Sequence, residues 1–355
     1  MSNIAAIVVL LVVILPFSYS FSLQRYHSSY SYPLTPTKTA KINYKVTGRE
    51  GGAPVLLIHG FGGSVNHFRH TSEFLERESY GVVAVDLIGF GGSDKPSPDD
   101  GSFEYSMELF RDVSLGLINH VTEGTGEVAT GRRWVIAGNS IGGLAALMVG
   151  STMHSDGYLS GIVLFNTSGG MSSFRYSSVP LALRPVLWIV RNVVLKRFGD
   201  AFWERFKSPS NVENILRSQV YPNDANVDDD LLDVILGPSN DEGARDVFLS
   251  VFGGDPGPTP EDVIDSYGNR GESDDHGCGD DDVVRIIAVW GTADSWTPIE
   301  GGRRLREYCS SKSTSPRVEF ELVEIEGAGH CLMDERPRDV EEGIKGWLEK
   351  GRERL

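Results

Sequence analysis

Short runs rich in β-branched residues, most of them continuously apolar, alternate with amphipathic stretches along most of the chain. Six runs have the length and composition of buried β-strands: Val55–Ile58, Val82–Val85, Trp134–Ala137, Gly161–Phe165, Val283–Trp290 and Val318–Ile325. The stretch 106–121 repeats its apolar residues at the spacing of a helix. Continuously apolar strands that alternate with helices are typical of a parallel sheet covered on both faces. The pattern therefore predicts an α/β fold with a mostly parallel central sheet.

Residues 169–282 interrupt this alternation. They contain several helical patterns and no strand pattern, and they end in a Gly- and Asp-rich tract at 271–282 that is typical of a solvated loop. We interpret 169–282 as a helical cap whose last part, from 261, is an acidic linker. The cap is inserted into an α/β core that comprises residues 49–168 and 283–355.

The first 48 residues differ in character from the rest. Ile4–Leu15 is an unbroken apolar run of twelve residues, followed by Pro16 and the small-residue pattern at 18–20. A helix of this length rises about 18 Å, short of the roughly 30 Å core of a bilayer, so we expect residues 1–20 to form a signal peptide. Residues 21–48 contain no acid and are rich in Ser and Tyr, which we interpret as a transit-like or linker segment.

This combination resembles the bipartite plastid-targeting leaders of diatoms and related algae, in which a signal peptide precedes a transit segment that begins with Phe, here Phe21. The resemblance implies import into a plastid. Secretion or retention in the endomembrane system is the alternative, and an uncleaved hydrophobic anchor is the third.

The chain is acidic, and its charge is unevenly distributed. It carries 33 Lys and Arg against 49 Asp and Glu, a formal net charge of -16. Nucleic-acid binding requires clustered Lys and Arg, so we expect no nucleic-acid partner. Residues 212–282 hold 19 acids and three bases, whereas 175–207 hold seven bases and two acids. Because the basic stretch includes the apolar run 181–198, it predicts a peripheral membrane contact through the cap; an ordinary cap helix with solvated cations is the alternative.

The cysteines and histidines form no metal-binding pattern. Cys278, Cys309 and Cys331 are too few and too scattered for a disulfide scaffold, although one disulfide stays open, and no His/Cys spacing is typical of zinc. We therefore expect neither a metal nor an organic cofactor.

A candidate nucleophile lies between a predicted strand and a predicted helix, in the segment GNSIGG at 138–143. A serine on such a sharp turn has a strained backbone and an exposed hydroxyl, and flanking glycines leave room for the strand and helix to approach each other. The segment predicts Ser140 as the nucleophile. The amide of Ile141, at the start of the helix, is the first candidate donor to an oxyanion.

A serine nucleophile needs a base and a carboxylate that orients it, in the chain order Ser, acid, His. Asp294 follows the strand 283–290, and His330 follows the strand 318–325, which places both at the same sheet edge as Ser140. Asn166, after the strand 161–165, cannot ionise, which favours Asp294 as the acid. The loop HGFGG at 59–63 follows the first buried strand, and its glycines let the Phe61 amide serve as the second oxyanion donor.

From residue 55 to residue 344 the chain resembles the α/β-hydrolase superfamily, in its cap-bearing ester-hydrolase branch. The similar segments are HGFGG at 59–63, DLIGFGGSD at 86–94, GNSIGG at 138–143, GTADSWTP at 291–298 and GHCLMDERP at 329–337. Within the superfamily, LIHGFGGSVNHFRH at 57–70, Asn139 before the nucleophile and LFNTSGG at 164–170 are most similar to plant pheophytinases and chlorophyll dephytylases.

This resemblance implies a serine carboxylic-ester hydrolase that cleaves the phytyl ester of chlorophyll or pheophytin and releases phytol. Any magnesium would belong to this hydrophobic substrate. The alternative is a hydrolase of other lipid or small esters, or a carbon–carbon bond hydrolase with the same triad. A non-catalytic α/β-hydrolase scaffold is the third reading, but such scaffolds usually lack a triad residue, and this chain has all three.

Overall fold

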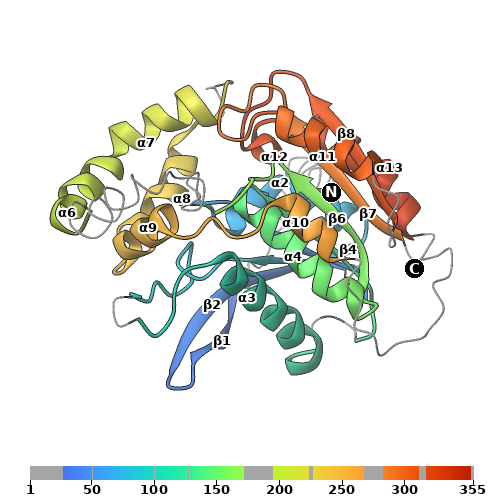
Figure 1. Cartoon of the computed structure of the whole chain (residues 1–355), viewed down its shortest axis with the longest axis horizontal. Helices are drawn as coiled ribbons and strands as arrows, with labels where there is room; N and C mark the ends of the chain where they lie inside the picture. Colours follow the sequence, from blue (N-terminus) through green and yellow to red (C-terminus); the bar gives the residue numbers. More distant parts are fainter. Residues whose placement is uncertain are drawn as a thin grey trace, which may run out of the picture.

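The computed structural model describes residues 27–49, 51–98, 101–126, 128, 130–171, 195–223, 227–267, 283–311 and 317–352. Its centre is a twisted sheet of eight strands in the order β1-β2-β4-β3-β5-β6-β7-β8 (Figure 1). The strands are β1 (His27–Thr35), β2 (Lys38–Gly48), β3 (Ala53–Ile58), β4 (Tyr80–Val85), β5 (Trp134–Asn139), β6 (Leu159–Phe165), β7 (Val283–Gly291) and β8 (Arg317–Ile325).

All six strands expected from the apolar runs are present, as β3 to β8, and each pairs in parallel with its neighbours among them. Among the strands of the described residues, only β1 and β2 pair antiparallel, at one edge of the sheet. The predicted α/β fold with a mostly parallel sheet is therefore confirmed.

The beginning of the core differs from the prediction. We expected it at residue 49, after a transit-like segment 21–48, but β1 and β2 already belong to the sheet, and β2 pairs with β4. The reason is a period-2 pattern in β2, in which Ala40, Ile42 and Tyr44 are buried and the residues between them are not. The predicted signal peptide, residues 1–20, lies outside the described residues.

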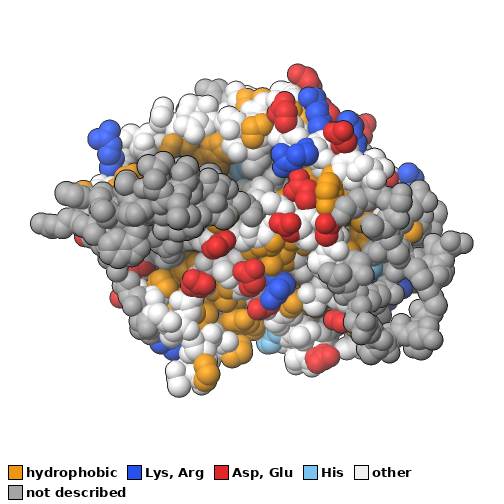
Figure 2. All heavy atoms as spheres, viewed as in Figure 1, with side chains coloured by type: hydrophobic (Ala, Val, Ile, Leu, Met, Phe, Trp, Pro, Cys, Tyr) orange, Lys and Arg blue, Asp and Glu red, His pale blue; other side chains and the backbone are white. Residues whose placement is uncertain are grey.

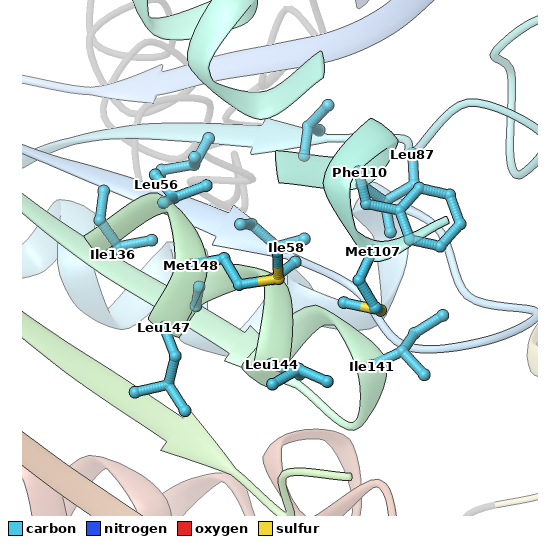
Figure 3. Packing of buried hydrophobic residues seen from close by; sticks show 14 of the residues in the cluster. Leu56, Ile58, Leu87, Met107, Phe110, Ile136, Ile141, Leu144, Leu147 and Met148 are labelled. Carbon is cyan, nitrogen blue, oxygen red and sulfur yellow. The ribbon is translucent and has the colours of Figure 1, made fainter. Parts of the chain in front are cut away.

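Helices cover both faces of the sheet, because successive strand residues point to opposite sides. One face carries α3 (Met107–Asn119), α4 (Ile141–Ser155) and α11 (Glu300–Ser311); the other carries α2 (Arg69–Arg77), the short α12 (Leu332–Glu335) and α13 (Pro337–Arg352). In Figure 3, the strand residues Leu56 and Ile136 pack near Met148 of α4. Within the described residues, every helix is too short or too polar to span a membrane.

The described part of the cap contains α6 (Leu195–Phe206), α7 (Pro209–Ile215), the π-helical turn η6 (Leu216–Val220), α8 (Asp229–Ser239) and α9 (Ala244–Gly253). In Figure 1 these helices stand to one side of the sheet, beyond the end of α4. Most of the basic stretch 175–207, and the acidic tract 271–282, lie outside the described residues.

One predicted part of the cap belongs to the core instead. The helix α10 (Pro260–Ser266) lies against α4, with Val263 and Ile264 buried in the core, and the Tyr267 hydroxyl donates to the Leu147 carbonyl at 2.7 Å. The segment from 261 was predicted as a linker because it leads into the Gly- and Asp-rich tract at 271–282. The apolar side chains between its acids attach its first part to the core.

Candidate active site

Ser140 occupies a strained turn between β5 and α4. Its backbone has φ 55° and ψ −122°, a conformation that costs a non-glycine residue about 1–3 kcal/mol. Its amide donates to the Phe165 carbonyl at 3.0 Å. A Cβ atom at Gly142 would lie 2.2 Å from the Ile58 carbonyl oxygen, and one at Gly138 would lie 2.1 Å from the carbonyl oxygen of Gly142. Both glycines are therefore required by the close approach of strand and helix.

Asp294 and His330 form a buried pair next to this turn. His330 Nδ1 lies 2.8 Å from Asp294 Oδ2, and each residue is 5% exposed. The other carboxylate oxygen, Oδ1, accepts the amides of Trp296 at 2.8 Å and Thr297 at 3.0 Å, which fixes its orientation. Since the carboxylate accepts from Nδ1–H, His330 Nε2 is the ring nitrogen that can accept a proton.

Thr297 is a polar residue of the site that the sequence motifs did not identify. Its hydroxyl lies 2.5 Å from Asp294 Oδ2 and 3.3 Å from His330 Nδ1. The signal in the sequence is local, because an Asp side chain commonly bonds the backbone two residues on, here at Trp296, and the resulting turn brings the next residue, Thr297, close to the carboxylate. The hydroxyl adds a fourth hydrogen bond to the carboxylate of Asp294, beside those from two backbone amides and His330 Nδ1.

Asn166 ties together the loops that carry the acid and the base. It follows β6 with φ 44°, and its side-chain amide donates to the carbonyls of Gly329 at 2.7 Å and His330 at 2.9 Å. Its side-chain oxygen accepts the amide of Gly291, at the end of β7, at 2.9 Å. The residue that cannot serve as the acid thus holds both neighbouring loops in place.

The loop 60–63 packs directly against the nucleophile turn. A Cβ atom at Gly60 would lie 3.0 Å from Ser140 Cβ. His59 Nδ1 donates to the Gly60 carbonyl at 2.7 Å, and its Nε2 accepts the Leu87 amide at 3.0 Å. Burial lowers the pKa of His59, so the ring stays neutral and can play both roles. The loop that carries Phe61 thus lies against the nucleophile turn at Gly60, and Ile141 is the first residue of α4.

Cys331 adjoins His330 but has a protonated thiol. Burial raises its pKa to about 12, and thiolate is the reactive form of cysteine. Of the described cysteines, neither Cys309 nor Cys331 forms a disulfide. The described His, Cys, Asp and Glu side chains include no group of three or more arranged to hold a metal ion.

A cap segment, residues 219–223, lies across the acid and base loops; we call it the strap. The carbonyl of Val220 accepts the His330 amide at 2.9 Å, and the carbonyl of Gln219 accepts the Ser295 hydroxyl at 2.9 Å. A Cβ atom at Gly329 would lie 2.2 Å from Pro222 Cδ, so the strap lies directly on the base loop.

Two acids that follow His330 fasten the strap. Glu335 accepts the amide of Gly329 at 2.7 Å with one oxygen and the amide of Asn223 at 2.9 Å with the other. Asp334 accepts the Tyr221 hydroxyl at 3.3 Å and the Nε–H of Arg69, from α2, at 2.8 Å. One short sequence, GHCLMDERP, therefore carries the candidate base and its connection to the cap.

A cavity of about 120 Å³, the catalytic cavity, lies between core and cap. Its lining is mostly apolar and includes Gly60, Phe61, Gly62, Gly63, His67, Asn139, Phe206, Val212, Ile215, Leu216, Val220, Tyr221, Ile235, Trp296, His330 and Cys331. A second cavity of about 90 Å³, the distal cavity, shares the side chains of Phe61, Phe206, Val212 and Ile235 with it.

The distal cavity continues away from His330 and is strongly apolar. Phe90, Trp203, Leu236, Val247 and Phe248 line it. The ammonium of Lys95 also borders it, but that group already donates to the Gly91 carbonyl at 2.8 Å and pairs with Asp241 at 2.8 Å. The space therefore suits a hydrocarbon chain.

The fold and site define an α/β-hydrolase, and comparison with known families agrees. The alpha/beta hydrolase family model matches residues 55–342, and the chain belongs to this family. Among curated relatives, the chloroplastic pheophytinase of Arabidopsis thaliana is 24% identical over 340 residues, which cover 87% of this chain and 64% of that protein. Lipase 1 of Psychrobacter immobilis is 26% identical over 175 residues, which cover 49% of this chain and 48% of that protein. The chain thus spans less than two thirds of the length of either relative.

Solved structures share the fold. An esterase from Thermogutta terrifontis superposes with a TM-score of 0.61 at 21% identity, covering 91% of this chain and 99% of that one. A serine hydrolase involved in carbazole degradation gives a TM-score of 0.59 at 18% identity, covering 91% of this chain and 99% of that one.

Proposed function

We propose that this hydrolase cleaves carboxylic esters with a large apolar group, and that its substrate is the phytyl ester of chlorophyll or pheophytin. The observation that carries the proposal is the buried Asp294–His330 pair beside the strained Ser140, with His330 in the lining of a mostly apolar cavity. The similarity to a pheophytinase and to lipases supports the choice of an apolar ester.

In the proposed mechanism, His330 Nε2 removes the proton of Ser140 as its hydroxyl attacks the ester carbonyl. Asp294 stabilises the imidazolium through the 2.8 Å hydrogen bond. The amides of Phe61 and Ile141 donate to the oxyanion, and the alcohol leaves with the proton from His330. Water then attacks the acyl-enzyme with His330 as the base, which releases the acid and restores Ser140.

The test compares the purified protein with Ser140→Ala on pheophytin a, chlorophyll a and p-nitrophenyl butyrate, with phytol measured by chromatography. We expect Ser140→Ala to lower kcat by about 10⁶-fold while the fold is retained. Turnover of the small ester without release of phytol from either pigment would refute the pigment assignment. Activity unchanged in Ser140→Ala would refute the mechanism.

We also propose that the cap contacts membranes in which the substrate is dissolved. Phe202 of α6 and Phe252 of α9 are 49% and 52% exposed, and both rings contact Phe248. Exposed aromatic side chains on a cap can enter the boundary between headgroups and acyl chains. On the face drawn in Figure 2, hydrophobic side chains are exposed between acidic ones. Replacing both phenylalanines with Ser should weaken binding to liposomes of plastid lipids, and unchanged binding would refute this contact.

For localisation, we propose import into a plastid, directed by residues that precede β1. Because β1 begins at His27, the address is expected within residues 1–26. A fluorescent protein fused after residue 26 should enter plastids, and its secretion would favour the alternative address.

A further inference from the structure

The catalytic cavity contains few polar side chains, and most of them are already hydrogen-bonded. The amide of Asn139 donates to the carbonyls of Phe165 and His330 at 3.1 and 3.2 Å. Tyr221 donates to Asp334, and the Trp296 indole donates to Gln219 Oε1 at 3.3 Å. Cys331 is hydrogen-bonded to Tyr221. Among the described side chains that line the cavity, His67 is therefore the polar one, besides the reactive His330, that can still form a hydrogen bond with a ligand.

His67 is held in one tautomer by the turn that follows the oxyanion loop. The Ser64 amide donates to His67 Nδ1 at 3.0 Å, in a capping box at the start of η1 (Val65–Phe68). An acceptor Nδ1 places the proton of the neutral ring on Nε2. The described residues supply no acceptor for this Nε2–H. It is the polar atom that His67 can offer to a molecule in the cavity.

The ring stays neutral under ordinary conditions. His67 is 7% exposed, and burial lowers its pKa to about 4, with the neighbouring His59 acting in the same direction and Asp334 and Asp86 against it. A neutral imidazole that offers one N–H inside an apolar cavity selects for a hydrogen-bond acceptor rather than for a charged group. A ligand without an acceptor atom would leave the Nε2–H of His67 buried and unpaired, and binding of such a ligand is therefore disfavoured.

We propose that His67 is a specificity-determining residue whose Nε2–H donates to a second acceptor oxygen of the substrate, such as a ketone close to the scissile ester. This inference rests on the proposed function, because it concerns the substrate of the same cavity. It narrows the substrate class from apolar esters to apolar oxo-esters. His67 acts on substrate choice, not on the bond-breaking step.

Two substitutions separate the donor of His67 from its structural role. In His67→Asn, the side-chain oxygen can replace Nδ1 as the acceptor of the Ser64 amide, but nothing replaces Nε2–H. In His67→Gln, the side-chain amide reaches the position of Nε2 and keeps a donor there. The probes are hexyl 3-oxobutanoate and hexyl 4-oxopentanoate, each paired with the ester that lacks the ketone, hexyl butanoate or hexyl pentanoate.

We expect His67→Asn to lower the ratio of kcat/KM on each oxo-ester to kcat/KM on its plain partner about tenfold, because the neutral hydrogen bond is lost on the oxo-ester alone. His67→Gln should keep most of the activity on oxo-esters. Equal losses on all four esters in His67→Asn, with an unchanged unfolding temperature, would overturn the assignment while leaving the esterase function intact. If wild type and Ser140→Ala were equally inactive on all four esters, the proposed function itself would fail.

Discussion

On the core side of the catalytic cavity, the reactive side chains are held by hydrogen bonds between buried polar groups; on the cap side, the lining is almost entirely apolar. Asp294 alone receives two backbone amides, a hydroxyl and an imidazole. By contrast, α6 to α8 present Phe206, Val212 and Ile235 to the same space. Directional bonds fix atoms within fractions of an ångström, whereas apolar contacts tolerate changes of shape. We infer that the core determines the chemistry and that the cap determines which chain fits.

The largest expected effect comes from breaking the core side. In Asp294→Asn, the side-chain amide would still fit the turn but would no longer favour Nδ1–H or stabilise the imidazolium of His330. We expect kcat for p-nitrophenyl butyrate to fall about 10⁴-fold without loss of the fold. Asp156→Asn, at an exposed position after α4, is the matched control. A loss below tenfold would show that Asp294 is not the acid of the triad.

The next effect tests the junction between the two sides. Glu335 joins the amide of Gly329, next to the candidate base, to the amide of Asn223 in the strap. Glu335→Gln removes the charge and one acceptor oxygen, which leaves one buried amide unpaired. We expect about 2–3 kcal/mol of lost stability in urea unfolding and a fall in kcat of about tenfold.

Glu342→Gln, on the exposed side of α13, should change neither quantity. Loss of stability with kcat unchanged would mean that the strap supports the fold but does not position His330.

A smaller effect concerns the neutral histidines of the core side. The unfolded chain takes up a proton on His67 below its ordinary pKa of 6.5, whereas the folded protein does so only near pH 4. The contribution of neutral His67 to the free energy of unfolding is therefore fully present above about pH 6.5 and is lost as the pH falls toward 4. At pH 5 the loss is about 2 kcal/mol, and His59, whose pKa is also lowered, acts in the same direction.

Urea unfolding of wild type and His67→Asn at pH 7 and pH 5 checks this. The loss of stability between the two pH values should be about 2 kcal/mol smaller in the variant. His70→Asn, with a side chain 37% exposed, is the control. An equal loss in wild type and His67→Asn would contradict the expected role of His67.

The sequence predicted the parts of the fold whose signal is local. The parallel strands β3 to β7 are mostly buried on both faces, so each is a nearly continuous apolar run, whereas β8, at the edge of the sheet, alternates apolar residues with Glu. The antiparallel strands β1 and β2 were missed because one face of each is apolar and the other polar, an alternation that Ser, Tyr and Lys partly conceal. Short motifs likewise predicted the strained turn at Ser140 and the strand ends that precede Asp294 and His330.

The remaining site residues depend on contacts between distant segments. Asn166 is recognisable as a link only when the loops after β7 and β8 lie on either side of it. Glu335 bridges a core loop and a cap segment that are 112 residues apart in the chain. His67 became a candidate only when the other polar side chains of the cavity were seen to be paired. No local pattern carries such information.

The smallest expected effect concerns the cap side, where the distal cavity is expected to select the length of the substrate chain. Ala244 of α9 lines the distal cavity and is absent from the lining of the catalytic cavity. In Ala244→Leu, the larger side chain would occupy part of the roughly 90 Å³ that we expect to hold the end of a long chain. We expect kcat/KM to fall about tenfold for p-nitrophenyl palmitate and to stay within twofold for p-nitrophenyl acetate.

The same substitution at the exposed Ala201 of α6 controls for a general effect on the cap. Phytyl acetate, which has a short acyl group and a long alcohol, distinguishes the two halves of the ester. Loss on palmitate alone would assign the distal cavity to the acyl chain, and loss on phytyl acetate alone would assign it to the alcohol. Equal losses on short and long esters would mean that the distal cavity does not select chain length, and that the cap fits its substrate through the catalytic cavity alone.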